Sequence, residues 1–257
     1  MIKTRSVVLH RFVYSDSSWI VKALTEDCGI VGFILKGAKR KDSPFKGALD
    51  PLALSEVVYR ENPRKSASGD GGLLFVKEAT LLDWRGNLRI NLLSQAIAQV
   101  MAEILLKYAP QGVPLQEEFA LLNAALDGLN QEAPRADTFS RWLIHTSDLW
   151  GYHLDLTSCY RCDCRLTESA ADFHPETGGL LCKDCLGAET PRARPETLQG
   201  LWALRNQPGD ANSQMDHHQK AFVENALLAY LRCHIGFLKD LKTLHFLTET
   251  RKLFPDG

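Results

Sequence analysis

Short runs of hydrophobic residues, divided by polar turn-forming clusters, fill the first third of the chain. The runs are rich in Val, Ile, Leu and aromatic residues, and Ser, Asp, Gly and Pro gather between them, which is typical of β-strands joined by turns. No long helical segment interrupts them, so we expect a small antiparallel β-barrel, for which the five-stranded OB type is the natural candidate. The predicted strands are Arg5–Val13, Trp19–Thr25, Ile30–Leu35, Leu52–Tyr59 and Leu73–Asp83.

A helical spacing of apolar residues replaces the strand pattern from Asn87 onward. The simplest interpretation of these stripes is a packed helical core, and the alternative is that one stripe leaves a groove open for a partner peptide. The sequence therefore predicts an α+β chain, with an OB-fold domain over residues 1–85 and an α-helical domain over residues 86–257. The predicted helices cover residues 93–108, 115–129, 138–150 and 221–249, the last as one long helix or two.

Two Cys-x-x-Cys pairs stand out within the predicted helical domain. Cys159 and Cys162 form the first pair, and Cys182 and Cys185 form the second after an interval of nineteen residues. Each pair makes a tight turn that directs two thiolates to one point, and two such turns supply the tetrahedron of a four-thiolate zinc site. We therefore predict a structural Zn²⁺ site, a zinc knuckle carried by an insertion at about residues 157–188.

The segment between the two pairs leaves part of this site open. Phe173–Gly179 is typical of a hairpin that would return the second pair to the first, and Cys164 and His174 lie near enough to replace one ligand. A closed four-thiolate site offers no position for water, which favours an architectural role over catalysis. The alternative is that the cysteines are unligated or form disulfides. Without an export signal we expect a reducing compartment, where metal binding is favoured over disulfides.

The charge of the chain is balanced as a whole but uneven along its length. The 257 residues carry a net charge of −1, with 45% hydrophobic and 24% charged residues, as in ordinary globular proteins of one or two domains. Residues 1–85 hold 14 Lys and Arg against 10 Asp and Glu, whereas residues 86–150 hold 4 against 7. Any nucleic-acid contact is therefore expected on the barrel. Without a signal peptide or an apolar run of about 18 residues, we expect a cytoplasmic protein with no membrane partner.

The densest basic cluster follows the third predicted strand. It contains Lys36, Lys39, Arg40 and Lys41 within six residues, and Lys46 follows. Cations that follow phosphates and rings that stack on bases would bind a single strand with little base preference. The alternative is a solvated loop that keeps the barrel in solution, and the residues alone leave both open. No phosphate-loop, dinucleotide or hydrolase motif occurs, so we find no catalytic constellation. The aromatic residues near this loop in the sequence are Phe33, Phe45 and Tyr59.

Short segments along almost the whole chain carry a resemblance to a known family through their order and spacing. They are Val7–Leu9, Tyr14–Ser18, Leu24–Gly29, Leu35–Arg40, Lys77–Asp83, Gly151–Leu156 and Gly178–Cys182. Each is weak alone, but together they resemble the RecO family of bacterial recombination mediators. The resemblance implies an N-terminal OB domain and a helical C-terminal domain that carries the zinc knuckle.

The resemblance also implies what such a protein does. It implies a non-enzymatic mediator of DNA repair and recombination that binds single- and double-stranded DNA, anneals complementary strands and helps to load RecA onto strands coated with single-stranded DNA-binding protein (SSB). It implies RecR and the C-terminal tail of SSB as partners, with RecA engaged indirectly, at the bacterial nucleoid. The other interpretation is a zinc-stabilised protein–protein adaptor that does not touch nucleic acid. The DNA-binding residues expected from the match of the basic loop are Lys36, Lys39, Arg40 and Lys41, with Lys46, Arg11, Lys22 and Arg60 as weaker candidates.

Overall fold

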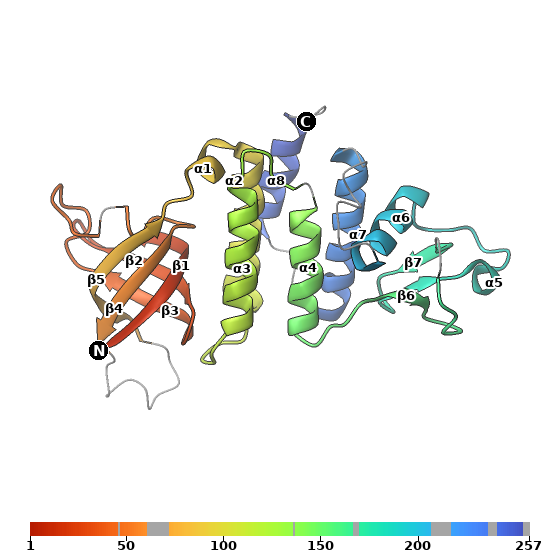
Figure 1. Ribbon diagram of the computed structural model, residues 1–257, viewed down its shortest axis with the longest axis horizontal. Coiled ribbons are helices and arrows are strands. Elements are labelled where there is room, and N and C mark those ends of the chain that lie inside the picture. The colour runs from red at the N-terminus through yellow and green to blue at the C-terminus, as the bar shows by residue number, and fades with distance from the viewer. Residues whose placement is uncertain are drawn as a thin grey trace. The chain divides into compact units, whose positions relative to one another are not determined.

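The computed structural model describes residues 1–45, 47–60, 72–135, 137–166, 170–206, 217–235 and 241–253. The chain groups into two compact units, Met1–Glu132 and Ala133–Gly257. The barrel shares the first unit with the first three helices (Figure 1), so the boundary predicted after residue 85 falls inside a compact unit. Among the described residues, no helix is long and apolar enough to cross a membrane.

Five strands close into a barrel in the first unit, as predicted (Figure 1). Their order around the barrel is β1-β2-β3-β5-β4, and neighbours are antiparallel except β3 and β5, which pair in parallel through Phe33 with Leu74 and Ile34 with Phe75. Because side chains alternate across a strand, every second residue points inward and fills the core. The strands are β1 Ile2–Val13, β2 Trp19–Thr25, β3 Gly29–Leu35, β4 Leu54–Arg60 and β5 Leu74–Asp83.

Three helices follow the barrel in the same unit. Helix α2 begins where the Asn91 side chain accepts a hydrogen bond from the Ser94 N–H at 2.9 Å, which satisfies one of the free N–H groups at a helix start. The predicted apolar stripes of α2 and α3 are buried, as Met101 and Leu122 illustrate at 0% exposure, so their interpretation as helical core is confirmed. The helices are α1 Gly86–Ile90, α2 Leu92–Tyr108 and α3 Gln116–Leu129.

One buried arginine fastens α3 to the barrel. The Arg85 side chain is 0% exposed, and its guanidinium donates to the Leu52 carbonyl at 2.7 Å, to Asn123 Oδ1 at 2.6 Å and to Asp127 Oδ1 at 3.0 Å. The backbone of Arg85 has a φ of 54°, in the left-handed region. This conformation turns the chain between the end of β5 and the start of α1. The planar fork of an arginine can reach all three acceptors at once, which a lysine could not do.

The second unit combines helices with a small three-stranded sheet of order β6-β8-β7 (Figure 1). β7 and β8 form the hairpin predicted between the two Cys pairs. Gly178 lies in its turn with a φ of 71°, and a Cβ at this position would lie only 2.6 Å from the Tyr230 ring. The predicted stretch 221–249 forms two helices. The elements are α4 Thr138–Leu149, β6 Asp155–Cys159, β7 Asp172–His174, β8 Gly179–Leu181, α5 Lys183–Leu186, α6 Pro195–Asn206, α7 His217–Ile235 and α8 Lys242–Lys252.

A buried ion pair joins α7 to α8. Glu224 is 2% exposed, and the Arg251 guanidinium donates to its carboxylate. Burial raises the pKa of Glu224, and the positive charge of Arg251 opposes that rise. The carboxylate therefore depends on Arg251 to stay ionised inside the protein.

We expect Arg251→Ala to lower the free energy of unfolding by about 2 kcal/mol near neutral pH. A fully buried pair would lose roughly 3–5 kcal/mol, but Glu224 can take up a proton when its partner is gone. A carboxyl with a raised folded-state pKa costs stability as the pH rises, so the loss should shrink as the pH falls below that raised pKa. Urea unfolding from about pH 5 to 8 measures it. The double variant Glu224→Gln/Arg251→Ala removes both charges of this pair and should show no such recovery; a pH-independent loss in the single variant would contradict the prediction.

Candidate nucleic-acid interface and metal centre

The basic loop is docked on the turn between β1 and β2. Lys39 donates from its backbone N–H to the Ser17 carbonyl at 3.2 Å and from Nζ to the Ser15 carbonyl at 3.0 Å. Within the loop, the Arg40 N–H donates to the carbonyl of Gly37 at 3.0 Å, and Gly37 has a φ of 71°, which favours glycine. The loop therefore holds its cations on a fixed backbone. The four predicted cations of this loop are all exposed: Lys36, Lys39, Arg40 and Lys41.

A pocket of about 460 Å³ lies where the loop meets this turn. Serine residues of the turn line it together with Lys36 and Arg40 of the loop. Hydroxyl groups, backbone N–H groups and cations are the donors that proteins use for phosphate oxygens. The pocket therefore suits an anion. The polar residues of its lining are Tyr14, Ser15, Ser17, Ser18, Lys36 and Arg40.

Two of the aromatic residues that the sequence suggested for base stacking are in the barrel core. Phe33 and Tyr59 are 0% and 1% exposed, and their ring centroids lie 5.2 Å apart. Both occupy inward positions of their strands, as the alternation of side chains requires, and Phe45 is only half-buried. The expectation that Phe33 and Tyr59 could contact nucleic acid is therefore wrong.

The rings that lie beside the loop cations belong to Trp19 and Phe75. The Trp19 ring centroid lies 5.4 Å from Lys39 Nζ and 4.6 Å from Arg11 Cζ, and the Phe75 centroid lies 4.9 Å from Lys36 Nζ. Rings and cations combined in this way are typical of single-strand binding surfaces. Sequence reasoning missed both rings, because their strands do not adjoin the loop in sequence and come beside it only through the pairing of β2 and β5 with β3.

The weaker candidates are divided by the structure. Arg11 lies on Trp19 and forms an ion pair with Asp50 at 2.5 Å. Arg60 is exposed at the end of β4, opposite Phe75 on β5. Lys22 is half-buried on the barrel wall opposite Gly32, and Lys46 lies outside the described residues. The structure thus places Arg11 on the Trp19 ring and Arg60 opposite Phe75 in the strand register, and a DNA contact by any of the four stays a prediction.

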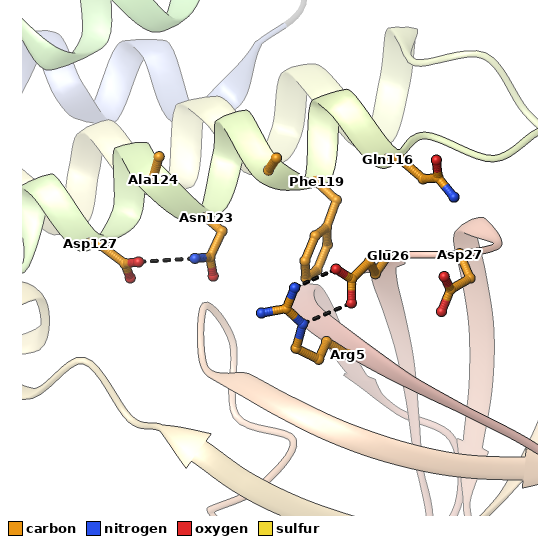
Figure 2. A pocket seen from close by; sticks show the side chains of 9 residues that line it. Arg5, Glu26, Asp27, Gln116, Phe119, Asn123, Ala124 and Asp127 are labelled. Atoms are coloured by element: carbon orange, nitrogen blue, oxygen red, sulfur yellow. Dashed lines mark hydrogen bonds and ion pairs between the residues drawn. The ribbon is translucent and has the colours of Figure 1, made fainter.

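The other end of β2 carries the opposite charge. A pocket of about 450 Å³ lies there between the barrel and α3, lined by the carboxylates of Glu26, Asp27 and Asp127 and by one guanidinium, that of Arg5 (Figure 2). Figure 2 shows Arg5 paired with Glu26 and lying beside the ring of Phe119. Nε of Arg5 donates to Oε2 of Glu26 at 2.7 Å. The hydrogen bond from Arg5 lowers the pKa of Glu26. A surplus of carboxylates repels phosphates, so this pocket limits any DNA contact at that end.

Cysteine thiols converge in the second unit. The sulfur atoms of Cys159, Cys162, Cys164 and Cys182 all lie within 4.8 Å of one another, and Cys162 Sγ lies 3.8 Å from Cys182 Sγ. A zinc ion with Zn–S bonds of about 2.3 Å has ligand sulfurs about 3.8 Å apart at tetrahedral angles. The thiols present therefore fit a zinc ion, and they could equally hold another thiophilic metal.

The structure brings the predicted ligands together and places Cys164 beside them as an alternative ligand. Cys185 adjoins the group, since its N–H donates to Cys182 Sγ at 3.4 Å, and the thiols of Cys162 and Cys182 raise its pKa. Cys164 completes the tightest set of four. Burial opposes ionisation of Cys159, but backbone N–H groups, that of Cys182 foremost, lower its pKa to about 6. The ligand set with Cys185 rather than Cys164 stays a prediction.

His174, the other possible substitute ligand, is engaged by carboxylates. Its ring is buried, with Nε2 3.1 Å from Asp172 Oδ2 and Nδ1 3.7 Å from Glu176. Asp172 is itself 1% exposed, and its Oδ1 accepts hydrogen bonds from the N–H groups of Arg192 and Ala193. This buried carboxylate fixes the segment that leads into α6 against the hairpin, and both nitrogens of His174 face carboxylates rather than the thiols.

Comparison with protein families and curated proteins covers almost the whole chain. The family model described as "Recombination protein O N terminal" matches residues 1–82, and "Recombination protein O C terminal" matches residues 90–245. The chain belongs to the recombination protein O family. Two similar relatives carry the name DNA repair protein RecO: one of Anaeromyxobacter sp. (strain K), 30% identical over 96% of each chain, and one of Roseiflexus sp. (strain RS-1), 27% identical over 98% of this chain and 86% of its own.

Family membership assigns this chain a role in DNA repair and recombination. Residues 83–89, where β5 gives way to α1, separate the two matched segments. The first covers the barrel with its basic loop, and the second covers the thiol cluster. Both candidate sites therefore lie within regions that define the family.

Proposed function

We propose that this chain is a non-enzymatic recombination mediator that binds single- and double-stranded DNA, anneals complementary strands and helps to load RecA onto SSB-coated strands. The observation that carries the proposal is the exposed loop of Lys36, Lys39, Arg40 and Lys41, held on the β1–β2 turn beside a pocket suited to anions. Cations on a rigid backbone contact phosphates in any sequence, as a mediator that acts along the genome requires.

The same proposal names the partners of the site. RecR and the C-terminal tail of SSB would bind this protein directly, and RecA would be engaged through the strand that it delivers. A protein that binds both SSB and the DNA raises the local concentration of each, so that two weak contacts together give a stronger attachment. Annealing follows if the basic surface reduces the repulsion between two strands. We expect such a protein to work at the bacterial nucleoid.

In this proposal, the thiol cluster holds a structural Zn²⁺. Cys159, Cys162 and Cys182 would supply three ligands, and Cys185 or Cys164 the fourth. Four thiolates leave no position for water, so the ion would stabilise the small sheet and offer no catalytic function. The DNA contact would then depend on the barrel rather than on the metal.

Neutralising the basic loop tests the proposal. We expect Lys39→Gln/Arg40→Gln/Lys41→Gln to weaken single-strand binding and to flatten its salt dependence. Each lost phosphate contact removes roughly 0.7 from the slope of log K against log salt, so three contacts remove about 2. Fluorescence anisotropy of a labelled oligonucleotide at several salt concentrations measures both quantities.

A matched control removes the same charge elsewhere. Lys3, Lys107 and Lys252 are each already paired with a glutamate, and their replacement by Gln should leave the slope nearly unchanged. An unaltered slope in the loop variant would refute the loop assignment. If the wild-type protein shows no salt-dependent binding at all, the zinc-stabilised adaptor becomes the better account.

A further inference from the structure

A line of alternating cations and aromatic rings leads away from the basic loop. It begins at Lys39 and Arg11, which both lie against the ring of Trp19. Arg11 continues it through its ion pair with Asp50, at 2.5 Å. Asp50 also accepts a hydrogen bond from Nε1 of Trp84 at 3.5 Å, so the line runs from β2 to the residue that follows β5.

The line ends on the first residues beyond the barrel. Arg89 of α1 places its guanidinium 4.6 Å from the centroid of the Trp84 ring and donates to the Trp84 carbonyl at 2.7 Å and the Pro51 carbonyl at 2.8 Å. The indole of Trp84 is thus oriented by Asp50 at its edge and by Arg89 on its ring, yet 48% of the residue remains exposed. A large ring held in place and left open to solvent is ready to stack on a base.

The charge along this line is positive beyond what Asp50 neutralises. Burial lowers the pKa of Arg89, the Asp50 charge opposes that shift, and the charges of Arg11 and Arg85 add to it. Arg85 has Asp127 as its own partner, whereas Arg11 and Arg89 share the field of one carboxylate. An anion placed here would therefore relieve repulsion between guanidinium groups.

We propose that a single DNA strand runs from the basic loop along Trp19 and Arg11 to Trp84 and Arg89, where Trp84 stacks on a base and a strand phosphate takes over the Arg11 contact now made by Asp50. This inference rests on the proposed DNA binding and adds to it a second attachment outside the basic loop, on the segment between the barrel and α2. Asp50 acts as an internal competitor that weakens binding at this point.

The exposed side chains at the end of the line could instead bind a protein partner. The charge of this surface distinguishes a protein partner from a DNA strand. An apolar docking surface would gain nothing from the cations that flank both indoles, whereas a nucleic-acid strand uses rings and cations together. The DNA strand is therefore the occupant to test, and the protein partner is an alternative outcome.

The test compares Trp84→Ala, Trp84→Tyr and Asp50→Asn with the wild type in anisotropy titrations of labelled oligo-dT at several salt concentrations. Trp84→Ala should weaken binding at least about fivefold, the lower end of what one base–aromatic stack contributes. Trp84→Tyr keeps a ring and should recover most of that loss, which excludes a merely structural effect. Asp50→Asn should strengthen binding, because Arg11 can then reach the strand phosphate without competition from a carboxylate. The control is Ile90→Ala, which removes a side chain that is 84% exposed and lies outside the line.

Each outcome decides the matter. Unchanged affinity in Trp84→Ala, or binding that Asp50→Asn fails to strengthen, would overturn the path while leaving the loop intact as a binding site. An equal loss in Ile90→Ala and Trp84→Ala would also overturn it and indicate an apolar contact surface. If the wild type itself shows no salt-dependent binding, the proposed function and the path both fail; if only the loop variant loses binding, the proposed function stands alone.

Discussion

Cys159→Ser is expected to destabilise the second unit strongly and to leave the DNA affinity of the folded protein unchanged. Cys159 is 0% exposed and belongs to the tightest set of four thiols. The free energy of metal binding is folding free energy when the site does not exist in the unfolded chain, and it is on the order of 10 kcal/mol in small zinc peptides. Because helices of this unit also pack without the metal, we expect a smaller loss, of at least about 3 kcal/mol.

Metal analysis and thermal unfolding measure this expectation together. If the proposal is right, the wild type contains one zinc ion per chain. A chelator should then lower the unfolding temperature of the wild type toward that of Cys159→Ser. The unfolding temperature of Cys159→Ser itself should not change with the chelator. Cys233→Ser is the matched control, since Cys233 is an exposed thiol on α7 outside the set of four. A well-folded Cys159→Ser protein that had lost only DNA binding would show that the thiol cluster is a contact site instead.

The same assay separates the two possible fourth ligands. Cys164→Ser and Cys185→Ser remove one thiol each from a cluster of five neighbours. The variant that loses its metal identifies the ligand, and the other should keep it. If both keep the metal, each thiol can replace the other, as their common proximity to Cys162 allows.

The sequence predicted those features that follow from local patterns. Short runs of Val, Ile, Leu and aromatic residues, divided by turn residues, predicted all five barrel strands, because both signals can be recognised within each segment. The hairpin between the Cys pairs was predicted for a similar reason: the Gly178–Gly179 turn and the spacing of the pairs leave the chain little choice. The convergence of the thiols likewise followed from two tight turns aimed at one point.

What the sequence could not predict depends on pairs that are distant along the chain. Phe33 and Tyr59 were misassigned to a DNA-facing role because their distance from the loop in sequence says nothing about which face of the barrel they occupy. Trp19 and Trp84 become members of one line only through Asp50, which lies between them in sequence with no motif to mark it. The parallel pairing of β3 with β5 also needs the closed barrel and has no local signal.

Arg85 was missed for the same reason, and its replacement gives the second large expected effect. Arg85→Ala should lower the free energy of unfolding of the first unit by about 3 kcal/mol or more. The change leaves the buried Leu52 carbonyl without its donor, which costs about 1–3 kcal/mol, and it empties the volume of a side chain that is 0% exposed. Urea unfolding measures the loss, since the slope with denaturant should stay the same if only stability changes.

Two control variants show why the guanidinium, rather than the charge pair, supplies this stability. Asp127 is 47% exposed on its side chain, so water can replace its partner, and Asp127→Asn should cost below about 1 kcal/mol. Arg85→Lys keeps the charge, but one ammonium cannot reach Leu52, Asn123 and Asp127 together, so it should recover only part of the loss. If Arg85→Lys were as stable as the wild type, the charge alone would suffice. If Asp127→Asn matched Arg85→Ala, the ion pair would be the main contribution and the fork that joins α3 to the barrel would be secondary.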